Sequence, residues 1–89
     1  MEIPVDDELR AICASISTAP ESEETWCERE SDDEFQTEHY CGGFDADERA
    51  FCFSKFCSSG GEVWFQFTLG EAAQIASGNI QRIPARPAG

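Results

Sequence analysis

Large apolar side chains alternate with smaller or polar ones through the second half of this chain, and that alternation constrains the fold more than any other feature. Four of them recur at every second position of residues 62–69: Val63, Phe65, Phe67 and Leu69. Successive strand side chains point to opposite faces, so a strand here has one apolar face. Residues 49–57, with Phe51 and Phe53, repeat the pattern. The sequence therefore predicts two strands that share one core.

Two more strands are predicted upstream. Residues 25–30 form a weak strand candidate, and residues 35–44 form a second one that Gly42 and Gly43 loosen. Small and acidic residues at 31–34, 45–48 and 58–61 mark the turns between strands.

Helices are predicted at both ends. Asp6 can cap a helix whose apolar positions recur with helical spacing, and Pro20 ends it. The apolar stripe consists of Leu9, Ile12, Cys13 and Ile16. A second helix covers residues 68–77, with Thr68 and Glu71 at its start and Gly78 as its stop.

A two-residue turn at Ala46 and Asp47 would set the register of the central hairpin. It pairs Tyr40 with Phe53, Glu38 with Lys55, and Cys41 with Cys52. The core face then carries Tyr40, Phe44, Phe51 and Phe53. The opposite, partly solvent-exposed face carries His39, Cys41, Cys52, Ser54, Phe56, Trp64, Gln66 and Thr68.

These elements predict an α+β fold, with an N-terminal helix, an antiparallel meander of three or four strands, and a C-terminal helix. At 89 residues the chain has room for one core. We expect one domain over residues 1–83 and a flexible tail at 84–89.

Acidic residues are concentrated in the middle of the chain. The whole sequence has 18 Asp and Glu against 6 Lys and Arg, a net charge of −12. Residues 21–48 hold twelve acids and one base, Arg29, which is a net charge of −11. That equals the charge of about 19 Å of duplex DNA. We expect a Lys/Arg-rich protein as partner, and neither nucleic acid nor an anionic membrane. The chain itself is expected to be a monomer or a homodimer.

The candidate partner-binding residues are the acids of this region together with one aromatic residue that fits an interface hot spot. They are Glu28, Glu30, Asp32, Asp33, Glu34, Glu38, Asp45, Asp47, Glu48 and Trp64.

The five cysteines are interpreted as reduced thiols of a cytoplasmic protein, because the N-terminus shows no export signal and the number is odd. An alternative is a zinc site in which His39, Cys41 and Cys52 converge, with Cys27 or Cys57 as a fourth ligand. A cross-strand disulfide between Cys41 and Cys52 is a further alternative. The preferred interpretation has no metal and no cofactor.

Catalytic motifs are absent from the sequence. It has one His, no nucleophile elbow and no phosphate loop, and its Asp-rich turns lack the spacing of a calcium-binding loop. We therefore expect a protein that is not an enzyme.

In size, charge and lack of enzymatic motifs, the chain resembles the small acidic proteins with which phages block host defence. Anti-CRISPR proteins and DNA-mimic anti-restriction proteins are examples. This resemblance is one of type and implies an inhibitor of a nucleic-acid-binding effector. Two alternatives remain: an antitoxin or immunity protein that caps a toxic enzyme, and a small zinc-binding adaptor.

Overall fold

The computed structural model describes residues 1–19, 22–28, 35–57 and 60–87. Within these residues, three helices and seven strands follow one another. They are β1 (Glu2–Pro4), α1 (Asp7–Thr18), α2 (Glu23–Glu28), β2 (Phe35–Gln36), β3 (Tyr40–Asp45), β4 (Ala50–Phe56), β5 (Glu62–Phe67), α3 (Leu69–Ser77), β6 (Arg82–Pro84) and β7 (Arg86–Pro87).

The two main helices confirm the sequence prediction. The Asp6 side chain accepts a hydrogen bond from Leu9 N at 2.9 Å, which caps α1, and all four residues of the predicted apolar stripe are buried. Thr68 and Glu71 form a reciprocal capping box at the start of α3. Gly78 ends α3 with φ 87°, a left-handed conformation that glycine adopts at little cost.

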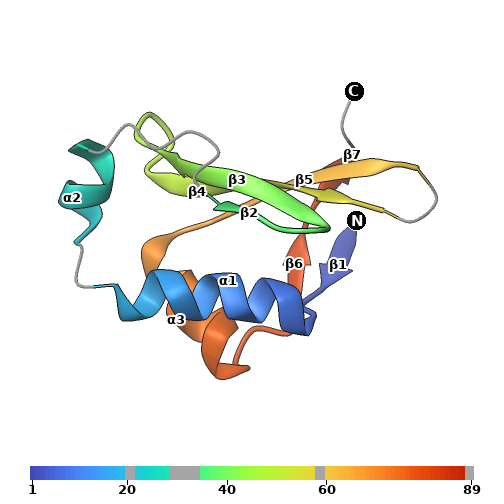
Figure 1. Ribbon diagram of the computed structural model, residues 1–89, viewed down its shortest axis with the longest axis horizontal. Helices are drawn as coiled ribbons and strands as arrows, with labels where there is room; N and C mark the ends of the chain where they lie inside the picture. The colour runs from blue at the N-terminus through green and yellow to red at the C-terminus, as the bar shows by residue number, and fades with distance from the viewer. Residues whose placement is uncertain (20–21, 29–34, 58–59, 88–89) are drawn as a thin grey trace.

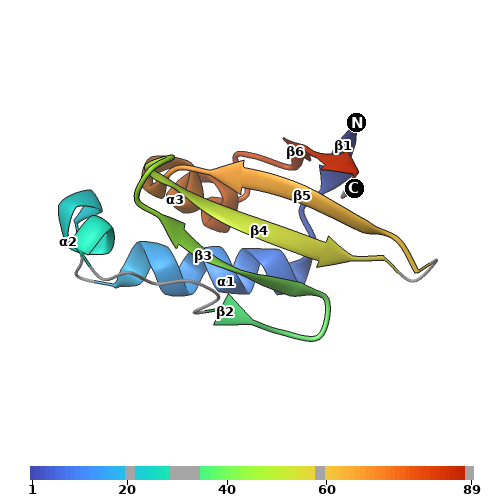
Figure 2. The ribbon, with the colours of Figure 1, turned by 90° about the horizontal axis from the view of Figure 1, so that it is seen from above.

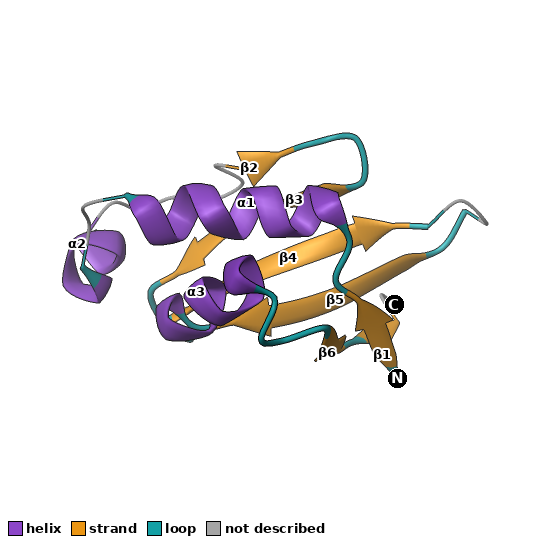
Figure 3. Cartoon of the chain, turned by 90° about the horizontal axis from the view of Figure 1, so that it is seen from below, coloured by secondary structure: helices purple, strands orange, loops and turns teal. Residues whose placement is uncertain are grey.

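The main sheet has five strands in the order β2-β3-β4-β5-β7, and every neighbouring pair is antiparallel. The α+β class is confirmed, with more strands than the three or four expected. Helices α1 and α3 pack against each other beneath one face of the sheet (Figures 1 and 3). Seen from the other side, β3, β4 and β5 lie in front of the helices, and no described helix covers them (Figure 2).

The central hairpin has a longer turn than predicted. Tyr40 pairs with Lys55 and Phe44 with Phe51, so the register is shifted by two residues and the turn comprises residues 46–49. The Asp45 carboxylate accepts hydrogen bonds from two backbone N–H groups of this turn, and Arg49 closes it with φ 54°. A shift of two leaves each side chain on its predicted face. The predicted register was thus wrong, but the predicted core face of Tyr40, Phe44, Phe51 and Phe53 was right.

The predicted strand at residues 25–30 is wrong, because α2 occupies residues 23–28. Ser22 starts this helix: its hydroxyl accepts a hydrogen bond from Thr25 N, and its carbonyl accepts one from Trp26 N. Glu23 and Glu24 in the first turn suit the positive end of the helix dipole. Trp26 is only 2% exposed, so α2 is fixed to the core by one large ring.

The predicted strand at 35–44 is in fact a hairpin. Strand β2 reverses into β3 through a two-residue loop, Glu38 and His39, which is closed by a hydrogen bond from Thr37 N to the Tyr40 carbonyl at 2.8 Å. Gly42 lies under Phe53 of β4, its partner in register. This close approach explains why a glycine occupies this position of β3.

Aromatic rings fill the space between the sheet and the helices. Phe67 stacks on Phe51 and Phe53 at centroid distances of 5.4 and 5.5 Å, and Trp26 meets Phe51 edge-on at 5.1 Å. The predicted core residues of β3, β4 and β5 are all buried, and Leu69 is partly buried as the first residue of α3. No polar or charged residue in the described part of the chain is buried.

The end of the chain differs from the frayed tail expected at 84–89. Strand β6 pairs with β1, and β7 pairs with the edge strand β5, so residues 84–87 belong to paired or bridging backbone; residues 88–89 lie outside the described part. The predicted turn at 31–34 also lies outside it. No helix among the described residues combines the length and apolar character that crossing a bilayer requires.

The Gly42 contact predicts a packing penalty. A Cβ at this position would lie 2.3 Å from the Cys52 carbonyl oxygen and 2.8 Å from Phe53 Cα, and backbone atoms of a central strand yield little. Gly42→Ala should therefore lower the free energy of unfolding by about 1–3 kcal/mol in urea titrations. Gly61→Ala is the control, since nothing lies within 4 Å of its Cβ position. Equal stability of the two variants would refute this account.

Candidate interaction surface

Four of the predicted partner-binding acids gather at one end of the sheet. Glu28 ends α2, Asp45 ends β3, and Asp47 and Glu48 belong to the β3–β4 turn. The helix and the turn are adjacent, because Arg49 Nε of the turn lies 3.5 Å from Glu23 Oε1 of α2 (Figure 1). Glu28, Asp47 and Glu48 are exposed, whereas Asp45 is half-buried by its bonds to the turn.

Glu38 lies elsewhere. It occupies the β2–β3 loop, and the six-residue strand β3 separates that loop from the β3–β4 turn by about 17 Å. Glu30, Asp32, Asp33 and Glu34 fall outside the described residues. Neither Glu28 nor Glu38 lies on a strand, although both fall in segments that the sequence predicted to be strands, since Glu28 is helical and Glu38 lies in a loop.

Trp64 lies on the uncovered face of the sheet, as predicted, with 43% of its surface exposed. Its Nε1 donates a hydrogen bond to Glu62 Oε1 at 3.0 Å, and the Arg86 guanidinium lies over its ring at 5.9 Å from the centroid. Phe56, also 43% exposed, points to the same face from β4. This pair of exposed aromatic residues is the main apolar feature of that face.

A groove of about 770 Å³ runs along this face. Cys41, Cys52, Ser54, Trp64 and Gln66 contribute to its floor. Segment 84–86 borders it, with Arg86 in β7, on the edge of β5. Glu48 and Glu71 also line it. Both lie at the acidic end, because Glu48 precedes β4 and Glu71 follows the end of β5, where Phe67 pairs with Phe51. The acidic end and the uncovered face that carries Trp64 and Phe56 therefore form one continuous surface.

The groove has a negative electrostatic field. Partial burial raises the pKa of the Cys52 thiol, the carboxylates of Asp45 and Glu48 raise it further, and Arg86 acts in the opposite direction. The thiol is thus protonated at neutral pH. A protonated thiol is a poor nucleophile, so Cys52 is not activated for nucleophilic chemistry.

The residues of the zinc hypothesis do not converge. His39 lies in the β2–β3 loop and bonds to Glu8, so it is absent from the uncovered face on which the sequence placed it. Cys41 pairs with Ser54, and Cys52 pairs with Gly43, so these cysteines are not direct cross-strand partners. No group of three or more His, Cys, Asp or Glu suited to a metal occurs among residues 1–19, 22–28, 35–57 and 60–87.

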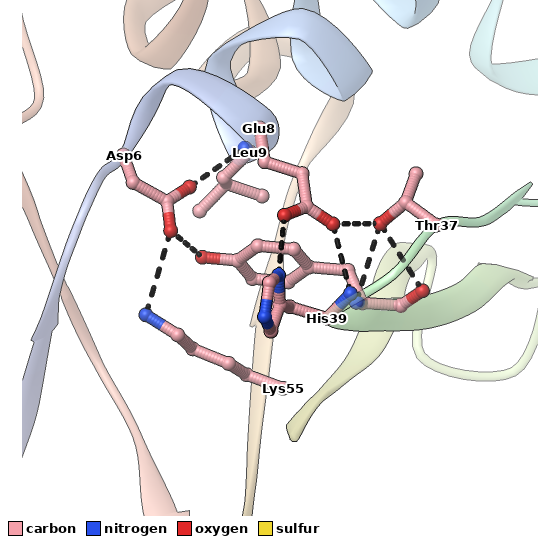
Figure 4. Close-up of polar contacts among 7 residues, drawn as sticks. Asp6, Glu8, Leu9, Thr37, His39 and Lys55 are labelled. Carbon is pink, nitrogen blue, oxygen red and sulfur yellow. Dashed lines mark hydrogen bonds and ion pairs between the residues drawn. The ribbon is translucent and has the colours of Figure 1, made fainter. Parts of the chain in front are cut away.

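A polar network that the sequence did not reveal joins the start of α1 to the sheet (Figure 4). One carboxylate oxygen of Glu8 contacts His39 Nδ1 at 2.8 Å, and the other accepts hydrogen bonds from His39 N and the Thr37 hydroxyl. Glu8 therefore holds the β2–β3 loop. The two partners are about thirty residues apart in sequence, and no local pattern indicates their contact.

Asp6 makes the second half of this network. Besides capping α1, its carboxylate accepts a hydrogen bond from the Tyr40 hydroxyl at 3.0 Å and lies 3.6 Å from Lys55 Nζ. The predicted partner of Lys55 was Glu38, which the shifted register moves away. Lys55 also lies over the Tyr40 ring, 5.5 Å from its centroid.

These contacts shift three pKa values. Hydrogen bonds from Thr37 and His39 lower the pKa of Glu8 to about 2. The hydrogen bond to Glu8 raises the pKa of His39 above 6.5. Burial, followed by the hydrogen bond to Asp6, raises the pKa of Tyr40. The network stabilises the domain, and its exposed His–Glu pair lies on the helix side of the sheet, away from the groove.

Comparison of the chain with protein-family models, with curated proteins and with solved structures finds no match. The candidate interaction surfaces are therefore identified from the structure alone. They are the acidic end, formed by α2 and the β3–β4 turn, and the groove that contains Trp64.

The Glu8–His39 pair predicts a bell-shaped pH profile of stability. Glu8 has a lowered pKa when folded, so its contribution is present above pH 4.5 and is lost as pH falls towards about 2. His39 has a raised pKa, so its contribution is present below pH 6.5 and is lost as pH rises through the folded value. The destabilisation caused by Glu8→Gln should therefore be largest between pH 4.5 and 6.5.

Chemical unfolding of both proteins across this pH range measures the difference. Glu24→Gln is the matched control, since it removes one exposed carboxylate from α2, away from the Glu8–His39 pair. A stability difference between wild type and Glu8→Gln that stays constant with pH would contradict the prediction.

Proposed function

We propose that this protein is a non-enzymatic inhibitor that covers a basic, nucleic-acid-binding surface of a partner protein. The acidic end would meet Lys and Arg side chains that normally contact phosphates. The proposed mode is that of a nucleic-acid mimic, as in the phage inhibitors that the chain resembles in type.

The observation that carries the proposal is the display of exposed carboxylates on α2 and the β3–β4 turn. Glu24, Glu28, Asp47 and Glu48 are exposed on adjoining elements, and the ion pair that Arg49 makes there is with Glu23. Such a concentration of like charge costs stability through self-repulsion. A role in binding explains this clustering better than solubility does, because solubility requires net charge but does not require the charge to be clustered.

Electrostatic attraction would act before contact. A strongly acidic domain is steered towards a basic cleft, and complementary charge raises the association rate more than it raises intrinsic affinity. The exposed rings of Trp64 and Phe56 would add apolar contact to the charged contacts of the acidic end.

A second candidate is an immunity protein that caps a toxic enzyme outside its nucleic-acid site. The exposed aromatic pair on the uncovered sheet face favours it, because such a face can bind protein without imitating phosphate spacing.

Binding to the partner captured from the natural host should depend on the position of the charge. Asp47→Asn with Glu48→Gln should weaken binding about tenfold or more at low salt, because both exposed acids lie at the acidic end. Glu2→Gln with Asp7→Asn is the matched control: it also takes the net charge from −12 to −10, but at exposed positions in the N-terminal segment. Calorimetry at about 0.05 and about 0.5 M salt should show a steep loss of wild-type affinity. Wild-type affinity that does not change with salt, or an equal loss of affinity in both double variants, would contradict the proposal.

Competition separates the two candidates. If the protein imitates nucleic acid, increasing concentrations of DNA or RNA should displace it from the partner, since both occupy the same basic surface. Fluorescence anisotropy of labelled protein measures this displacement. Simultaneous binding of protein and nucleic acid would favour the immunity candidate and exclude mimicry.

A further inference from the structure

The ring of Trp64 already holds a cation. Arg86 lies over it at 5.9 Å, and the ring nitrogen is fixed by its hydrogen bond to Glu62. Trp is the best aromatic partner for a guanidinium group, and a nearby carboxylate adds attraction. The ring and the carboxylate therefore make a site whose chemistry suits an arginine side chain.

Arg86 is held there by a short element. Strand β7 has two residues, and its pairing with β5 involves Val63 with Pro87 and Trp64 with Arg86. It forms one edge of the sheet. The backbone pairing does not depend on the arginine side chain, so the guanidinium can leave the ring without loss of the strand.

The rest of the groove also suits a cation. Glu48 and Glu71 line it, and Arg86 is the one Lys or Arg among the described residues around it. From the row of Phe51 and Phe67 to the row of Phe56 and Glu62, the face extends about 17 Å. That length accommodates an extended segment of several residues.

We propose that the groove receives an arginine-bearing extended segment of the basic partner, and that an arginine of that segment replaces Arg86 on Trp64. This inference rests on the proposed function, because it names the part of the basic partner that the uncovered face recognises. Arg86 then acts as an intramolecular stand-in for the partner's side chain, and Glu48 and Glu71 attract the neighbouring cations.

Two synthetic peptides, octa-arginine and octa-lysine, test the proposal. They carry equal charge, but only the planar guanidinium stacks well on an aromatic ring. Wild type should bind octa-arginine about three- to tenfold more tightly than octa-lysine. Trp64→Ala should abolish this preference while it keeps the binding that depends on charge alone. Calorimetry measures the affinity of both peptides for both proteins. In wild type, quenching of tryptophan fluorescence should in addition report Trp64, because Trp26 is only 2% exposed.

A pair of arginine variants tests the stand-in role. Arg86→Ala frees the ring and should strengthen octa-arginine binding severalfold. Arg82→Ala, at an exposed position of β6, removes the same charge away from the Trp64 ring and should have a smaller effect. Unfolding curves of all variants confirm that each is folded at the assay temperature.

The outcomes distinguish the two proposals. Equal affinity of wild type for the two peptides, or equal effects of Arg86→Ala and Arg82→Ala, would overturn the groove inference and leave the basic-partner function standing. Failure of both peptides to bind at low salt would overturn both.

Discussion

Burial of one face of β3, β4 and β5 beneath α1 and α3 is the constraint on which the rest of the structure depends. Each large aromatic ring removes roughly 150–250 Å² from water, and the ring of Phe67 stacks on both Phe51 and Phe53. The two main helices add the buried side chains of Leu9, Ile16 and Ile75 to this core. Both main helices are therefore needed on the same face, and no described helix is left to cover the other. The groove with Trp64 is the direct consequence, because a sheet packed on one side leaves its second face to solvent or to a partner.

Polar contacts fix how α1 and the β2–β3 loop are oriented against the sheet, which apolar packing alone does not specify. Asp6 caps α1 and also accepts a hydrogen bond from Tyr40, so one carboxylate connects the helix start to the central sheet. Glu8 performs the same task for the β2–β3 loop through His39 and Thr37. These two acids have partners within the fold, which separates them from the exposed acids Glu24 and Glu28 of α2 and Asp47 and Glu48 of the β3–β4 turn. The distinction matters for function, because carboxylates without such structural duties remain available to a partner.

The acidic end and the uncovered face meet at Glu48, which belongs to the turn and also lines the groove. Because the two surfaces are continuous, one partner can be attracted by charge and held by aromatic contact. Electrostatically steered complexes commonly combine these two contributions. The thiol of Cys52 lies in the same groove and stays protonated, so it is a poor nucleophile.

Local sequence patterns determined both capped helices, the core face of the three long strands and the exposure of Trp64, because capping and alternation act between residues close in sequence. They could not determine the four-residue turn at 46–49, since strand pairing shifted by two residues preserves every face. They also missed α2, where a single Trp26 packs into a core assembled from distant strands, and the hairpin at 35–44, whose loop is held by Glu8. Whether the acids of residues 21–48 share one surface was likewise a tertiary question. Segment 23–28 is a helix beside the β3–β4 turn, whereas Glu38 lies beyond β3. The sequence established how much charge this region carries, and only the packing of its elements decided where that charge is displayed.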